Sequence, residues 1–135
     1  MEYQVIYFSR KGSTKKVADA IASELNIESQ DVKNAELKND TMVFLGSGSY
    51  GSKPGKKMTK FIEKNDFNNR AVALFGTSGG GEGKETEAME NMLKNKDAKI
   101  KGRYFCKGKF WFGNKDKPDK KDLDDAKKFA KKMIK

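Results

Sequence analysis

The segment Ser9–Thr14 combines hydroxyl groups, positive charge and a glycine, which are groups suited to holding a phosphate. It follows the apolar run Val5–Phe8, whose length is typical of a buried strand, and precedes apolar residues at helical spacing between Val17 and Leu25. The unpaired N–H groups and the positive dipole end of a helix that begins here favour an anion. In the alternative interpretation a hydroxyl of Ser13 or Thr14 only caps the helix. The sequence predicts a phosphate-binding loop made of Ser9, Arg10, Lys11, Gly12, Ser13 and Thr14.

Two more glycine-rich segments follow apolar runs, Gly46–Ser52 and Thr77–Gly83. Ligands of parallel sheets bind beyond the carboxyl ends of the strands, so all three segments are expected at one edge of the sheet. Glycine allows close backbone approach, which favours a flat or phosphorylated ligand; the alternative is that the glycines only form tight turns. The predicted ligand contacts here are Gly48, Ser49, Tyr50, Gly51, Thr77, Ser78, Gly79, Gly80 and Gly81.

The elements that must position these loops alternate along the chain. A helix is expected after each strong strand, and the last helix is expected to begin at an N-cap formed by Asp119. This alternation predicts one α/β domain, residues 1–135, with a parallel sheet covered on both faces. The segment Lys33–Asp40 fits neither pattern. The predicted strands are Val5–Phe8, a weak edge strand Ile27–Val32, Thr41–Gly46, Ala71–Gly76 and Ile100–Cys106.

The residue types that are absent narrow the chemistry. The chain has no histidine, which excludes Ser-His-Asp and Cys-His sites and argues against a metal site. Its single cysteine, Cys106, excludes an internal disulfide framework and is expected to be buried at a strand end. No apolar run approaches the roughly 20 residues of a membrane span, and no leader-like segment is seen, so we expect a cytoplasmic protein. No side chain is predicted to be catalytic; a bound cofactor would supply any chemistry.

The sequence resembles the flavodoxin family over nearly the whole chain, and the three loops carry the resemblance. Ser9–Thr14 is similar to the family's phosphate loop, Ser49–Gly51 to its first flavin loop and Phe75–Gly83 to its second. The resemblance implies a flavodoxin-like three-layer sandwich with five parallel strands in the order 2-1-3-4-5. It implies noncovalent FMN, with the phosphate held by Ser9, Lys11, Gly12, Ser13 and Thr14.

The same resemblance implies roles for the ring-binding residues. Tyr50 would lie against the isoalloxazine ring, and the Gly51 carbonyl would accept a hydrogen bond from the reduced flavin. The backbone of Thr77–Gly81 would receive the pyrimidine edge. The implied function is that of an electron-transfer protein that shuttles electrons between redox partner proteins.

The chain departs from the family at two loop positions. Gly80 stands where a stacking aromatic is common, and Lys11 replaces a usual threonine. Trp111, in the lysine-rich segment Lys107–Pro118, is a candidate substitute that could stack on the ring. The alternative is that Trp111 and its aromatic neighbours cover the edge of the core or a partner surface.

The net charge of +10 is also unusual for the family, whose members are typically acidic. Residues 94–135 carry 16 basic and 6 acidic residues, which accounts for the whole excess. Either this is a solvated helix face or it is a docking surface for an acidic redox partner. Nucleic-acid binding is not expected, because Arg103 is the single arginine in this region. We expect a monomer.

One other function on the same fold stays open, and a second is excluded by the sequence. An FMN-dependent NAD(P)H reductase of quinones or other small acceptors stays open, although little loop sequence is left to build a second substrate pocket. A phosphate-accepting receiver domain needs acidic residues at the end of the first strand, where this chain has Ser9, Arg10 and Lys11. The charge of these residues therefore excludes a receiver domain.

Overall fold

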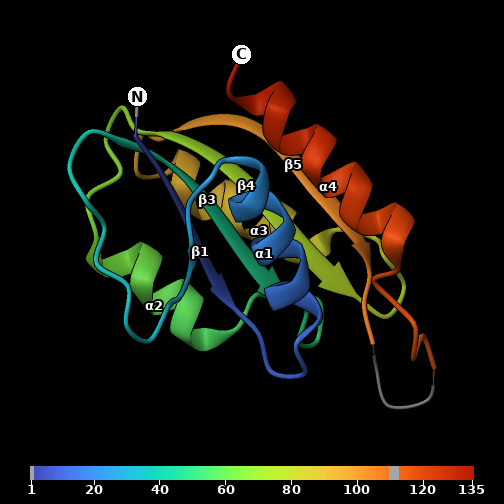
Figure 1. Ribbon diagram of the computed structural model, residues 1–135. Helices are drawn as coiled ribbons and strands as arrows, with labels where there is room; N and C mark the ends of the chain where they lie inside the picture. The colour runs from blue at the N-terminus through green and yellow to red at the C-terminus, as the bar shows by residue number, and fades with distance from the viewer. Residues whose placement is uncertain (1, 110–112) are drawn as a thin grey trace.

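The computed structural model describes residues 2–109 and 113–135. In this part of the chain, five parallel strands form one sheet in the order β2-β1-β3-β4-β5, with helices on both faces (Figure 1). The three-layer α/β fold and the strand order predicted from the sequence are confirmed. The elements are β1 (Glu2–Phe8), α1 (Ser13–Glu24), β2 (Ser29–Asp31), β3 (Thr41–Gly48), α2 (Lys56–Lys64), β4 (Ala71–Ser78), α3 (Lys84–Lys94), β5 (Lys99–Lys107) and α4 (Lys120–Met133).

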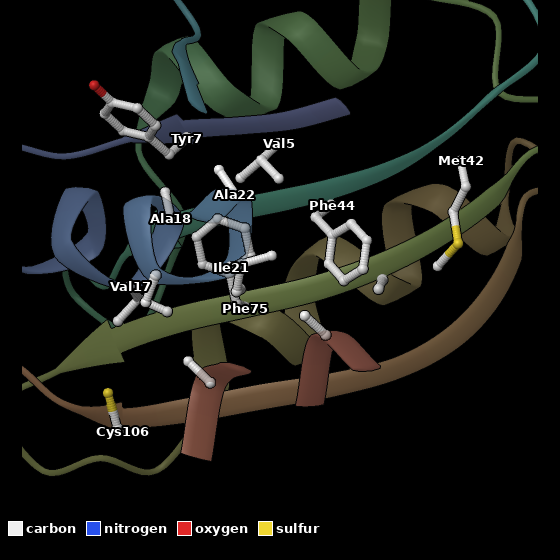
Figure 2. Close-up of a cluster of buried hydrophobic side chains, with 14 residues drawn as sticks. Val5, Tyr7, Val17, Ala18, Ile21, Ala22, Met42, Phe44, Phe75 and Cys106 are labelled. Carbon is white, nitrogen blue, oxygen red and sulfur yellow. The ribbon is translucent and has the colours of Figure 1, made fainter. Parts of the chain in front are cut away.

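Alternate residues of the central strands are buried on opposite faces of the sheet, which is why these strands are continuous apolar runs in the sequence. Val5 and Tyr7 belong to the cluster under α1 and α4, whereas Ile6 and Phe8 belong to the cluster under α2 and α3. Figure 2 shows the first cluster, in which side chains of α1 lie over those of the strands.

Phe75 illustrates how tightly this cluster is packed. Its ring is fully buried and covers Gly46 of the neighbouring strand. A Cβ atom added at Gly46 would lie 2.0 Å from the nearest ring carbon. The ring therefore occupies the space that a side chain on β3 would need.

The edge strands differ from the predictions in length. The second strand is shorter than the predicted Ile27–Val32, because only Ser29–Asp31 pairs with β1. The segment after it has no regular structure and is held by the buried side chain of Gln4, which donates to the Glu36 carbonyl (2.9 Å) and accepts from the Lys38 N–H (2.9 Å). A buried amide thus replaces secondary structure as the partner of this backbone.

Both local predictions near the carboxyl end of the chain are confirmed. Asp119 is the N-cap of α4 and forms a capping box with Asp122, in which each side chain accepts from the other residue's backbone N–H. Cys106 is buried near the end of β5. Among the described residues, no helix is long and apolar enough to cross a membrane.

Candidate functional site

Three glycine-rich loops meet at the carboxyl ends of the central strands. We name them the phosphate loop (Ser9–Thr14), the second loop (Gly48–Ser52) and the third loop (Thr77–Gly83). The hydroxyl groups of Thr14 and Thr77 are hydrogen-bonded at 2.8 Å, and both residues are buried. This bond joins the phosphate loop to the third loop, as expected of loops at one edge of a parallel sheet.

Two described residues that follow β5, Lys109 and Asn114, contact the same loops. The Lys109 N–H donates to the Ser13 hydroxyl at 2.8 Å, and the side-chain amide of Asn114 donates to the Gly79 carbonyl at 2.8 Å. Sequence reasoning missed Asn114, because a single asparagine in a lysine-rich segment carries no distinguishing pattern. The predicted contact Trp111 lies outside the described residues.

The phosphate loop leads into α1 through Gly12. Gly12 is the N-cap, with a left-handed φ of 92°, and its N–H donates to the Ser9 hydroxyl at 3.0 Å. Within the described residues no side chain caps this helix, so the interpretation of Ser13 or Thr14 as a cap is wrong. Their hydroxyls bond instead to Lys109 and Thr77. A helix start without a side-chain cap leaves backbone N–H groups for an anion.

The second loop is a tight turn. Tyr50 and Lys53 exchange backbone hydrogen bonds of 2.8 and 3.3 Å across Gly51 and Ser52, which have φ values of 63° and 67°. Positive φ at both central positions is the geometry that favours glycine, and it presents Gly51 to solvent.

Tyr50 joins this turn to the phosphate loop. The guanidinium of Arg10 lies 4.4 Å from the centroid of the Tyr50 ring, and Phe8 makes an edge contact with a centroid distance of 5.7 Å. Burial raises the pKa of the Tyr50 hydroxyl. A predicted phosphate contact, Arg10, thus stacks on a predicted ring contact, Tyr50.

The third loop is organised around its own side chains. The Gly81 N–H donates to the Ser78 hydroxyl at 2.8 Å, and Gly81 and Gly83 have positive φ. At Gly80, the position that lacks the usual aromatic, an added Cβ would lie 2.9 Å from a Glu82 carboxylate oxygen. Glu82 itself is exposed.

A buried acid beside the second and third loops was not predicted. Glu85, in the first turn of α3, is 0% exposed, and burial raises its pKa to about 7. It helps to line a cavity of about 190 Å³ between the two loops. The helical spacing of Glu85 with the buried Met89 and Leu93 was the signal that could have found it.

Larger hollows lie away from these loops. One of about 590 Å³ lies at the amino ends of β3 and β4, beside Asp40 and Arg70, and one of about 640 Å³ lies between α1 and α4. Neither contains any of the three glycine-rich loops. The smaller cavity is the better candidate, because ligands of such sheets bind at the carboxyl ends of the strands.

Comparison with known proteins agrees with the resemblance seen in the sequence. The flavodoxin domain model matches residues 4–132. The chain is 31% identical to an uncharacterised protein of Methanocaldococcus jannaschii over 91% of each chain. It is 32% identical to the flavodoxin-like domain-containing protein BilS of Clostridioides difficile, over 87% of this chain and 72% of that one.

Solved structures agree at the level of the fold. A flavodoxin from the domain Archaea superposes with a TM-score of 0.80 at 21% identity, covering all of both chains. The two-electron reduced flavodoxin of Megasphaera elsdenii superposes with a TM-score of 0.70 at 21% identity, over 96% of this chain and 98% of that one.

Proposed function

Since the chain belongs to the flavodoxin family, we propose that it binds FMN noncovalently at the three loops and carries electrons between redox partner proteins. The observation that carries the proposal is the hydrogen bond between Thr14 and Thr77, which joins the phosphate loop to the third loop. This bond lies at the start of α1, which has no side-chain cap among the described residues. Bound FMN would supply the redox chemistry. The protein's part would be binding, orientation and electrostatics.

The loops fit the two ends of FMN. An added Cβ at Gly12 would meet no described atom within 4 Å, so the helix start is open to a phosphate. Ser9, Lys11, Gly12, Ser13 and Thr14 would hold that phosphate. The ring would lie between the second and third loops, where small residues line the cavity beside Gly51 and Gly80. A flat ring needs such close backbone approach on its edges.

The partner surface that we propose is basic. β5 exposes Lys99 and Lys101 along the edge of the sheet, and Arg103, which also pairs with Glu90, lies 5.8 Å from the centroid of the exposed Phe105 ring. Cations around an exposed aromatic would steer and hold an acidic redox partner. Part of the charge on α4 is neutralised within the helix, where Lys120 pairs with Asp124 and Lys121 with Asp125. The edge of β5 is therefore the better docking candidate.

The phosphate loop gives a direct test. We expect FMN to bind about 100-fold more tightly than riboflavin, because only FMN carries the phosphate. Replacing Gly12 by valine should remove at least about tenfold of the FMN affinity and leave riboflavin affinity little changed, because the new side chain strains φ and fills the phosphate position. Flavin fluorescence quenching in titrations of the purified protein measures both.

The control for backbone strain is Asn69→Val, which places the same side chain at a φ of 60° at the opposite end of the sheet. It should leave both affinities unchanged. Equal affinity for FMN and riboflavin would contradict the phosphate loop, and no flavin binding would contradict the cofactor. Reduction of the bound flavin by NADPH alone would replace the carrier role with that of a reductase.

A further inference from the structure

Glu85 is a buried carboxyl group whose two oxygens have no hydrogen-bond partner among the described residues. It lies over Gly76 of β4, where an added Cβ would be 2.0 Å from one of these oxygens. Glycine at position 76 therefore makes the room that the carboxyl group occupies. Leaving a polar group buried and unpaired is costly, and such a group calls for an explanation in a ligand or a protonation change.

The groups around Glu85 do not neutralise it. The Arg103 guanidinium of β5 acts on its charge, but this side chain bonds to Glu90 (3.2 Å) and to the Thr86 hydroxyl (3.3 Å). Glu82 adds negative charge from the third loop.

Two further neighbours complete the surroundings. The backbone N–H of Glu85 itself and the Ser49 hydroxyl of the second loop favour its charged form, although neither forms a well-aligned hydrogen bond with the carboxyl group. The Cys106 thiol of β5 has its pKa raised to about 12 by burial and therefore stays neutral. The adjoining cavity is then the nearest open space to the buried carboxyl oxygens of Glu85.

This inference rests on the proposed FMN function. A flavin ring placed between the second and third loops would fill that cavity and keep water out of it. The charge of an ionised Glu85 would then lose the stabilisation that water in the cavity gives it, whereas a protonated Glu85 is neutral and loses little. Reduction would bring negative charge to the pocket and would also favour the protonated form of Glu85, because like charges in a poorly solvated site repel strongly.

We infer that Glu85 is a titrating residue of the flavin pocket, which takes up a proton when the ring binds and holds it more tightly when the ring is reduced. The proton comes from bulk water and forms an O–H bond on one carboxyl oxygen; no bond to the flavin forms or breaks. The electrons of reduction come from an external donor, which is dithionite in the test. Glu85 thereby couples the reduction potential to pH.

The test measures protons directly. FMN is titrated calorimetrically into wild type, Glu85→Gln and Glu87→Gln in two buffers of different ionisation enthalpy, at about pH 8, where the free carboxyl is mostly ionised. Glu87→Gln is the matched control, because Glu87 lies in the same first turn of α3 but is exposed. We expect wild type and Glu87→Gln to take up about half a proton or more per flavin, and Glu85→Gln to take up none.

A second measurement is the pH dependence of the reduction potential. Between about pH 7 and 9 the potential of wild type should depend on pH more steeply than that of Glu85→Gln. Should Glu85→Gln fail to fold, carbon-13 NMR of glutamate-labelled wild type decides: one carboxyl should titrate near pH 7 without flavin, and at higher pH with FMN.

The outcomes separate the two proposals. FMN binding with equal proton uptake in wild type and Glu85→Gln overturns the role of Glu85 and leaves FMN binding intact. An NMR titration in which every carboxyl ionises at its ordinary pH also overturns it. Failure of wild type and Glu87→Gln to bind FMN at all overturns the proposed function, and the inference about Glu85 falls with it.

Discussion

Replacing Phe75 by alanine is expected to lower the free energy of unfolding by about 3–5 kcal/mol, the range for removing a fully buried aromatic ring from a core. The ring is 0% exposed and packs between β3 and the helices α1 and α4. Its removal would open a cavity over Gly46, where no side chain is available to refill it. Urea unfolding followed by circular dichroism measures the change.

The close contact between Phe75 and Gly46 sharpens this test. Gly46→Ala alone should destabilise by about 1–3 kcal/mol, because its Cβ overlaps the ring. In the Phe75→Ala background the same substitution should cost much less, since the ring is gone. Additive effects in the double-mutant cycle would contradict the packing described. Phe105→Ala, which truncates a ring that is 38% exposed, is the surface control and should cost about 1 kcal/mol or less.

Glu85→Gln is expected to change how the stability of the flavin-free protein depends on pH. The pKa of Glu85 is raised from 4.5 to about 7 in the folded chain, so between these values the folded state holds a proton that the unfolded state has released. Stability of wild type therefore falls as pH rises through this window, and Glu85→Gln lacks that loss. The advantage of Glu85→Gln should grow by about 2 kcal/mol from pH 4.5 to above pH 7, which is less than the roughly 3 kcal/mol that the whole pKa shift would give without solvent screening.

The measurement is a series of urea titrations across this pH range. Glu87→Gln, on the exposed side of the same helical turn, should follow wild type. A constant difference between wild type and Glu85→Gln at all pH values would show that the carboxyl group ionises normally. This experiment needs no flavin, so it tests the burial of Glu85 separately from the proposed function.

Much of the architecture could be predicted from local patterns. The runs Val5–Phe8, Thr41–Gly46 and Ala71–Gly76 lie inside β1, β3 and β4, because strands buried on both faces need continuous apolar residues. The cap at Asp119 was predictable for the same kind of reason, since a capping box is made by residues three positions apart. Such features depend on near neighbours in the chain.

The site was predicted less completely. The three loops were placed correctly at one end of the sheet, but the partners of their side chains were not. Thr14 bonds to Thr77, which is 63 residues away, and Ser13 bonds to Lys109, which is 96 residues away. Glu85 was not predicted as a site residue, because charged residues are rarely fully buried and a polar helix start is typical of a solvent-exposed surface.

By itself, the sequence determined the alternation of strands and helices, the glycine-rich loops and the positive charge of residues 94–135, because periodicity and residue type express backbone and burial preferences locally. Only the tertiary structure decided which hydroxyls pair, that Arg10 stacks on Tyr50, and that Glu85 lies buried over Gly76. Those facts depend on distances between elements that are far apart in the chain. A carboxyl group acquires its shifted pKa from that assembled environment and not from its neighbours in sequence.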